Sequence, residues 1–250
     1  MFIPTSLVFV GIFLTDSNGG HMIKAILFDI DNTLLDFDAC VREAMKSGFQ
    51  KFGLRSYEDH MFETFEKINC EMWREIEKGN LTFEELLQTR WNRVFAALDI
   101  TFDGCIFEDF FGEFLFDCAI PVEGAAEILE YLEGRYILCV ASNGPYAQQL
   151  NRLRNANMLS CFSKFFISEK IGASKPSEDF FSHCINELNK ENKILPCEIM
   201  MIGDSVTSDI IGAAECGFKT CFFDKNTNKK ADRIPADHSI NRLKDICKIL

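Results

Sequence analysis

The sequence has few histidines and too few basic residues to balance its acidic ones. Its four histidines are His21, His60, His183 and His238, and none of them stands in a spacing typical of a zinc site. Lysines and arginines number 26, against 38 aspartates and glutamates, which gives a net charge of −12. Because nucleic-acid phosphates are bound by basic surfaces, this charge argues against a nucleic-acid polymer as a partner.

The sequence also lacks a C-x-x-C pair and an apolar run long enough to cross a bilayer. Its 11 cysteines are scattered, and several stand in apolar runs, which favours buried thiols in a reducing compartment and therefore a cytoplasmic protein. The apolar residues 7–14 are too short for a membrane span, and they have neither a preceding basic residue nor a following cleavage site. We therefore expect residues 1–21 to be a disordered extension, and we expect no membrane partner.

Strand and helix patterns alternate over most of the chain. Apolar runs that predict buried strands occupy residues 23–30, 136–142, 164–167, 198–202 and 219–223. Helical patterns lie between most of these runs, at residues 123–133, 145–157, 176–190 and 208–216. This alternation predicts an α/β fold with a parallel sheet.

The interval between the first two predicted strands has no strand pattern. Helical spacing of apolar residues instead covers residues 39–52, 57–78, 83–98 and 104–118. We interpret residues 38–119 as an inserted lobe of four helices, and residues 22–37 and 120–250 as the α/β core around it. A lobe inserted here would cover the ends of the strands as a lid.

Two aspartates follow the first predicted strand. Asp29 and Asp31 stand two residues apart at its end, and Thr33 follows two residues later. Carboxylates at the end of a buried strand are costly to desolvate unless a cation compensates them, and ligands of open α/β sheets bind at this end of the strands. A helix cap would explain one aspartate but not two. The pair therefore predicts a site for a cation, an electrophile or both.

Ser142, Asn143 and Gly144 follow the second predicted strand. The Ser142 hydroxyl and the backbone N–H groups of the next two residues are suited to a phosphoryl oxygen, helped by the N-terminus of the following helix. A simple strand-to-helix turn explains this segment equally well when it is taken alone. Lys175 precedes another predicted helix, where a lysine is most often solvated.

A second pair of carboxylates, Asp204 and Asp209, follows the fourth predicted strand and its Gly203. Taken alone, this segment is also compatible with a capped loop.

The order of all four segments, over residues 22–224, resembles the haloacid dehalogenase (HAD) superfamily of aspartate-nucleophile phosphatases. The helical insertion is similar to the first cap type of that superfamily. More narrowly, residues 28–37 and 203–210 resemble its noncanonical pyrimidine 5′-nucleotidases.

The resemblance implies a Rossmann-like core and a Mg²⁺ site. Asp29 would be the nucleophile and would bind Mg²⁺ together with the backbone carbonyl of Asp31 and the carboxylate of Asp204. Asp31 would also protonate the leaving oxygen and later deprotonate the attacking water, so it must carry a proton in the first step. Lys175 would add a fixed positive charge beside the nucleophile.

The same resemblance implies groups that bind the substrate or support the site. The substrate-binding set is Ser142, Asn143, Gly144, Lys175 and Thr33, the last as a buttress of the turn. Asp209 and Ser205 would stand behind the metal site, with Asp209 orienting Lys175 or a metal-bound water.

These roles predict a Mg²⁺-dependent phosphomonoester hydrolase that acts through an aspartyl-phosphate on nucleoside 5′-monophosphates. Its partner is then a small phosphorylated metabolite. A sugar phosphomutase or another small-metabolite phosphatase on the same fold is the alternative. A haloacid dehalogenase needs no metal and leaves Asp31 and Asp204 unexplained, and a non-catalytic binding protein is disfavoured because all four segments are complete. The sequence indicates neither the base or sugar of the substrate nor the oligomeric state.

Overall fold

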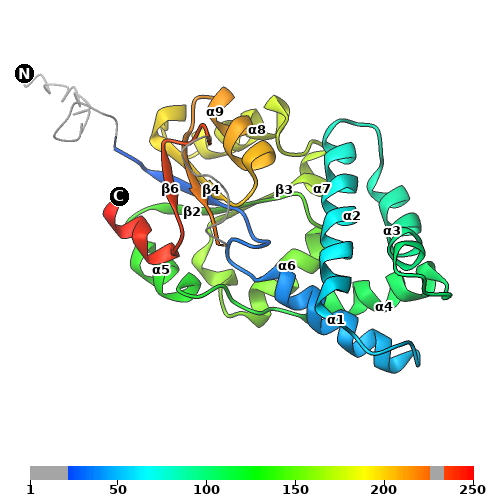
Figure 1. Cartoon of the computed structure of the whole chain (residues 1–250). Coiled ribbons are helices and arrows are strands. Elements are labelled where there is room, and N and C mark those ends of the chain that lie inside the picture. Colours follow the sequence, from blue (N-terminus) through cyan, green and yellow to red (C-terminus); the bar gives the residue numbers. More distant parts are fainter. Residues whose placement is uncertain (1–21, 226–233) are drawn as a thin grey trace, which may run out of the picture.

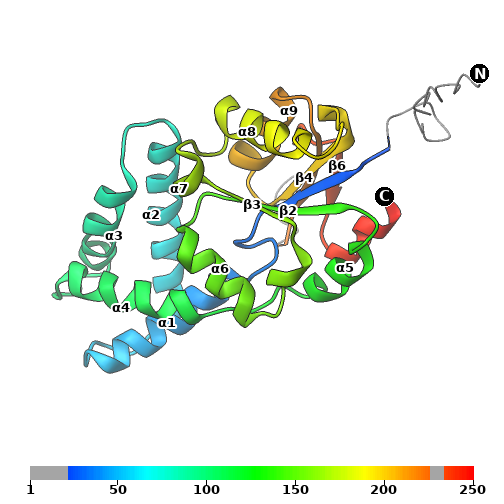
Figure 2. The ribbon, with the colours of Figure 1, turned by 180° about the vertical axis from the view of Figure 1, so that it is seen from behind.

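The computed structural model describes residues 22–225 and 234–250 and arranges them as an α/β core with a helical lobe beside it (Figure 1). The expectation for residues 1–21 lies outside these described residues. In the core a sheet lies between two layers of helices, and the lobe stands at one end of the sheet (Figure 2).

A six-stranded parallel sheet forms the core. Its strands are β1 (Ala25–Phe28), β2 (Ile137–Ser142), β3 (Lys164–Ile167), β4 (Ile199–Gly203), β5 (Lys219–Phe223) and β6 (His238–Ile240). Their order is β3-β2-β1-β4-β5-β6, which confirms the predicted α/β fold with a Rossmann-like parallel sheet. No sequence pattern predicted β6, because its three residues include the exposed His238 and Ser239 and form no apolar run.

The register of the central strands places their ends at one level. Phe28, the last residue of β1, pairs with Val140 of β2 and with Ile202 of β4. The polar segments that follow these three strands therefore emerge at the same edge of the sheet. This edge is where ligands bind in open parallel sheets.

Helices cover both faces of the sheet (Figures 1 and 2). They are α5 (Ala125–Leu132), α6 (Tyr146–Asn155), α7 (Ser168–Ile171), α8 (Glu178–Asn189) and α9 (Gly212–Glu215). Successive residues of β1 alternate between the layers, because Ile26 and Phe28 pack with α5 and α6, whereas Leu27 packs with α8 and α9. Two predicted helices differ from the structure. The helix predicted from residue 176 begins at Glu178, because the Ser177 hydroxyl caps α8. The helix predicted over 208–216 is a π-helical turn, Val206–Ile211, followed by α9.

Four helices form the lobe, as predicted. They are α1 (Phe37–Lys51), α2 (Asp59–Glu77), α3 (Phe83–Ala97) and α4 (Gly104–Asp117). Their facing sides bury aromatic rings, and the ring centroids of Trp91 and Phe107 lie 4.3 Å apart. Arg90 and Glu108 form an ion pair that is buried among these rings. Among the helices of the described residues, none is long and apolar enough to cross a membrane.

Two paired linkers join the lobe to the core. One leads from the end of β1 into α1, and the other returns from α4 to α5. The backbone N–H of Asp36 donates to the Ile120 carbonyl at 2.7 Å, and the N–H of Val122 donates to the Leu34 carbonyl at 2.9 Å. Because the linkers are bonded to each other, a movement of the lobe against the core must pass through both of them.

Candidate active site

Asp29 is the first residue after β1, and its side chain is buried at the edge of the sheet. Its backbone N–H donates to the Ile202 carbonyl at 2.9 Å, which continues the ladder with β4 and fixes the direction of the side chain. Burial raises the pKa of Asp29 to about 7; the positive charge of Lys175 opposes this rise, and Asp209 adds to it. Asp29 is therefore a desolvated carboxylate that depends on nearby positive charge to be ionised.

Lys175 supplies that charge from the loop between α7 and α8. Its Nζ donates three hydrogen bonds of 2.7 Å, to Asp29 Oδ1, to Asp209 Oδ1 and to the Ala141 carbonyl. Only 2% of the residue is exposed, and burial alone would lower the pKa of Lys175, but the carboxylates of Asp209 and Asp29 outweigh burial and raise it. The ammonium group is thus a permanent cation in the floor of the site.

The loop after β4 is folded around the side chain of Asp209. The N–H of Ser205 donates to Asp209 Oδ2 at 3.0 Å, while Oδ1 accepts from Lys175. Gly203 leaves the room for this contact, because a Cβ at that position would lie 2.2 Å from Asp209 Oδ2. These contacts hold both carboxylate oxygens of Asp209 within the protein, one against Lys175 and the other against the Ser205 backbone.

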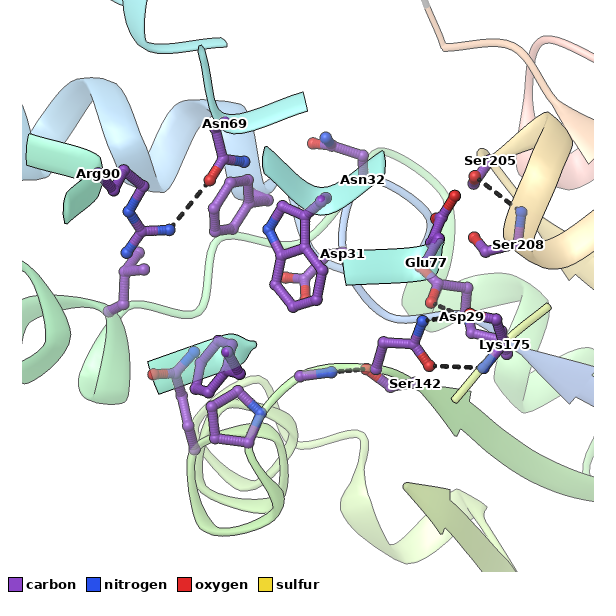
Figure 3. A pocket seen from close by; sticks show the side chains of 18 of the residues that line it. Asp29, Asp31, Asn32, Asn69, Glu77, Arg90, Ser142, Lys175, Ser205 and Ser208 are labelled. Atoms are coloured by element: carbon purple, nitrogen blue, oxygen red, sulfur yellow. Dashed lines mark hydrogen bonds and ion pairs between the residues drawn. The ribbon is translucent and has the colours of Figure 1, made fainter. Parts of the chain in front are cut away.

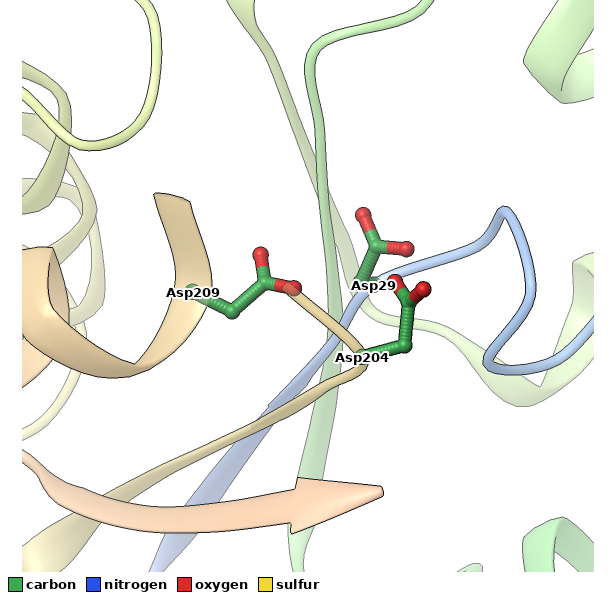
Figure 4. Close-up of side chains that lie close together, drawn as sticks. All are labelled: Asp29, Asp204 and Asp209. Atoms are coloured by element: carbon green, nitrogen blue, oxygen red, sulfur yellow. The ribbon is translucent and has the colours of Figure 1, made fainter. Parts of the chain in front are cut away.

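Three carboxylates meet at the edge of the sheet (Figure 4). Asp29, Asp204 and Asp209 each present an oxygen, and these oxygens all lie within 4.8 Å of one another. All three groups are acidic, and one buried lysine contacts two of them. An oxygen-only donor set with this charge fits Mg²⁺. Both oxygens of Asp209 accept hydrogen bonds within the protein, from Lys175 and from the N–H of Ser205.

Asp31 does not join this cluster, because its carboxylate is held by two side chains of α6. Arg152 Nη1 donates to Asp31 Oδ1, and Gln149 Nε2 donates to Asp31 Oδ2 at 2.7 Å. Gln149 and Arg152 are fully buried, and Gln149 Nε2 also donates to Ser142 Oγ at 2.9 Å. No sequence motif marked these two residues. Their spacing of three, which puts two large polar side chains on the buried face of one helix, was the available signal.

The segment after β2 uses its polar groups within the protein. The Asn143 side chain donates to the Lys175 carbonyl at 2.8 Å and accepts from the Lys175 N–H at 2.9 Å. The N–H of Gly144 donates to Ser142 Oγ at 3.1 Å rather than facing a ligand as expected. All three residues still line the cavity. Asn143 therefore fixes the backbone of Lys175, a contact that only the folded chain brings about.

Thr33 is not at the cavity, contrary to its place in the predicted substrate-binding set. Its side chain is fully buried, and its hydroxyl has no hydrogen-bond partner among the described residues. The turn that it occupies begins at Asn32, which has a left-handed φ of 60° and whose amide donates to Asp38 Oδ1 at 2.9 Å. Thr33 lies inside this turn and does not line the cavity.

A cavity of about 370 Å³ extends from the carboxylates to the lobe (Figure 3). Its core side includes Asp29, Asp31, Ser142 and Lys175. Its lobe side carries aromatic and polar side chains, which include Phe37, Asn69, Trp73, Phe83, Arg90 and Glu108. Helical periodicity could not separate these residues from the lobe core, because both kinds face inward.

The fold and the site define a class of protein: a parallel α/β core with an aspartate at the end of its central strand, a buried lysine beside it and a helical lobe inserted after that strand. The sequence pattern of the haloacid dehalogenase-like hydrolases matches residues 23–217, and the chain belongs to this family.

Characterised relatives share most of the chain. The sequence is 30% identical over 204 residues to the pyrimidine 5′-nucleotidase PynA of Streptococcus pneumoniae, which spans 80% of this chain and 83% of that protein. It is 24% identical over 228 residues to the pyrimidine 5′-nucleotidase YjjG of Escherichia coli. This alignment covers 90% of this chain and 96% of YjjG. The crystal structure of the HAD-hydrolase YfnB from Bacillus subtilis, bound to magnesium, matches with a TM-score of 0.83 at 27% identity and covers 92% of this chain and 99% of that chain.

We expect Gly203→Ala to destabilise the protein by about 1–3 kcal/mol, because the new Cβ would collide with the buried Asp209 carboxylate. Gly112→Ala is the matched control. Nothing lies within 4 Å of a Cβ at position 112 of α4, so this change should leave stability unchanged or raise it by up to about 1 kcal/mol. Urea denaturation followed by circular dichroism measures both. Equal stability of the two variants would contradict the close approach at Gly203.

Proposed function

We propose that this protein is a Mg²⁺-dependent phosphomonoester hydrolase that acts through an aspartyl-phosphate on Asp29, with nucleoside 5′-monophosphates as its substrates. The observation that carries the proposal is the buried Lys175 bridge between Asp29 and Asp209 at the base of the cavity. It presents a desolvated carboxylate and a fixed cation to the same ligand. This pairing suits attack on an anionic phosphorus centre.

In this proposal Mg²⁺ is held by the carboxylates of Asp29 and Asp204 and by the Asp31 carbonyl. When bound, it offsets the negative charge that Asp29 and a phosphate would otherwise place side by side. The donor set supports this assignment, because the oxygens of Asp29 and Asp204 lie within 4.8 Å of each other.

The side chains then have distinct tasks. An Asp29 oxygen forms a bond to phosphorus while the bond to the leaving oxygen breaks, and Lys175 stabilises the charge on the transferring oxygens. Asp31 gives a proton to the leaving oxygen and later takes one from the water that hydrolyses the aspartyl-phosphate. To do this it must exchange its contacts with Arg152 and Gln149 for contacts in the cavity. About a third of its side chain, 32%, is exposed, which leaves room for that rotation.

The lobe side of the cavity supports a nucleoside as the leaving group. The rings of Trp73 and Phe83 lie 5.8 Å apart along it and offer an apolar surface to a planar base. The volume of about 370 Å³ is within the range of small-molecule sites. Two characterised relatives named as pyrimidine 5′-nucleotidases add to this support.

Asn69 offers a single oriented donor to that leaving group. Arg90 Nε donates to Glu108 Oε2 at 3.1 Å, and Arg90 Nη1 donates to Asn69 Oδ1 at 3.0 Å. Because the Asn69 oxygen is engaged, its Nδ2 must face away from Arg90, as Figure 3 shows, and it has no hydrogen-bond partner among the described residues. A carbonyl oxygen of a nucleobase is an acceptor of the kind that this donor would recognise.

We expect Asp29→Asn to reduce phosphate release by at least about 1000-fold, because an amide does not replace the attacking carboxylate. Asp179→Asn, an exposed acid in the first turn of α8, is the control and should keep the wild-type rate. The assay is release of inorganic phosphate from a panel of nucleoside monophosphates and sugar phosphates. If Asp29→Asn turns over at the wild-type rate, Asp29 is not the nucleophile; an isomerised sugar phosphate without free phosphate would indicate a mutase.

Mg²⁺ should raise the melting temperature of the metal-free protein by roughly 5–10 °C at a hundredfold excess over its Kd, because the ion binds only the folded carboxylate site. Asp204→Asn removes a ligand and should reduce this rise to less than about 2 °C, while Asp179→Asn should show the full rise. Differential scanning calorimetry with and without MgCl₂ measures the effect. The same rise in Asp204→Asn and wild type would place the ion elsewhere.

Asn69→Asp tests recognition of the leaving group, because it keeps an oxygen for Arg90 and replaces the donor by an acceptor. We expect kcat/KM for nucleoside monophosphates to fall about 5- to 100-fold, and that for p-nitrophenyl phosphate to change less than about threefold. Asn80→Asp, on the exposed end of the α2–α3 connection, is the matched control and should change neither value. An equal loss with both substrates would show that Asn69 acts on the lobe rather than on the base.

A further inference from the structure

Two cysteines face each other where the two linkers meet the lobe. Cys40 lies in the first turn of α1, and Cys118 is the residue that ends α4. The Cys118 thiol donates to Cys40 Sγ across 2.7 Å, although 78 residues separate the two in sequence. The bonded pairs Asp36–Ile120 and Leu34–Val122 lie just below them on the same linkers. The two thiols therefore lie at the lobe end of the stretch over which the two linkers contact each other.

The guanidinium of Arg152 completes this arrangement from the core. Its Nε donates to the Cys118 carbonyl at 3.0 Å, and its Nη1 donates to Asp31. Its Nη2 is buried and has no hydrogen-bond partner among the described residues. A buried, unpartnered donor on a cation is costly unless an anion faces it. The Cys40 sulfur lies within the reach of this guanidinium, and as a thiolate it would be that anion.

The surroundings of the pair favour ionisation of one sulfur over the other. The hydrogen bond from Cys118 lowers the pKa of Cys40 to about 7, and the charge of Arg152 lowers it further against the effect of burial. The same contact raises the pKa of Cys118, which stays the protonated partner. A thiolate beside a thiol is the arrangement of an oxidisable cysteine pair, because the thiolate is the nucleophile and the thiol resolves the product.

We propose that Cys40 and Cys118 are a modification site at which a peroxide forms a disulfide across the two linkers. We further propose that this disulfide reduces turnover at the active site; this second statement rests on the proposed function.

The chemistry balances with hydrogen peroxide as the oxidant. The Cys40 thiolate attacks one peroxide oxygen, the O–O bond breaks, and the departing hydroxide takes a proton to become water, which leaves Cys40 as a sulfenic acid. The Cys118 sulfur then attacks the Cys40 sulfur, the S–O bond breaks, and hydroxide leaves with the Cys118 proton as a second water. Two thiols are oxidised to one disulfide, and one peroxide is reduced to two waters.

The disulfide would act on the active site by two routes. It would join α1 covalently to the end of α4 at the base of the lobe, so the two linkers could no longer shift against each other when the lobe moves relative to the core. It would also remove the thiolate that faces Arg152, the residue that holds Asp31 and the Cys118 carbonyl. Arg152 therefore connects the state of the thiol pair to the proposed acid–base group without any movement of the sheet.

The first experiment detects the bond itself and needs no activity. The purified full-length protein is treated with hydrogen peroxide, free thiols are alkylated, and peptides are mapped by mass spectrometry. We expect a peptide that links Cys40 to Cys118 and that disappears on reduction. Cys118→Ser should instead leave a sulfenic acid on Cys40 that dimedone traps, and Cys247→Ser, which removes an exposed cysteine, should form the link as wild type does. Free thiols at Cys40 and Cys118 after other cysteines have reacted would overturn the proposal.

The second experiment measures the consequence with the phosphatase assay. Peroxide treatment should lower kcat/KM of the wild type about fivefold or more, and reduction should restore it. The double variant Cys40→Ser/Cys118→Ser, checked for folding by circular dichroism, should keep its activity under the same treatment. If the link forms and activity does not change, the regulatory part is wrong. If the reduced protein hydrolyses no phosphomonoester, the proposed function fails while the mapped disulfide stands.

Discussion

The candidate site depends on one interaction, the contact of the buried Lys175 ammonium with Asp29 and Asp209. Three carboxylates at the edge of one sheet repel one another, and two of them are buried. Lys175 makes this tolerable, because its two 2.7 Å ion pairs lie where water is excluded and the attraction is little screened. Three carboxylate oxygens gathered in this way are a donor set of the kind that Mg²⁺ prefers. Removing the lysine would leave buried charges without compensation.

Much of the surrounding structure serves to hold that lysine. Asn143 fixes its backbone with two hydrogen bonds, and the Ala141 carbonyl accepts from its ammonium group. Gly203 has no side chain, so Asp209 can approach the end of β4 and meet Lys175. These groups come from two segments of the chain, the end of β2 and the loop after β4. The parallel register of β1, β2 and β4 brings them to one level.

Helix α6 is a second organising element, and it connects parts that would otherwise be independent. Gln149 joins Asp31 to Ser142, and Arg152 joins Asp31 to the linker at Cys118. Asp31, Ser142 and the second linker are therefore all held by one buried face of a ten-residue helix.

The sequence by itself determined the parallel sheet, the four-helix insertion and the segments that line the site, because apolar periodicity and strand-end carboxylates are local patterns. It did not determine β6, which lacks an apolar run. It also did not determine that Asn69 and Trp73 line the cavity, because core and cavity residues recur with the same helical period. Only the tertiary structure decided that the Asp31 carboxylate accepts a hydrogen bond from Arg152 and that Thr33 is buried away from the cavity. These contacts join residues far apart in the chain, and no local pattern encodes which distant partner a polar side chain will meet.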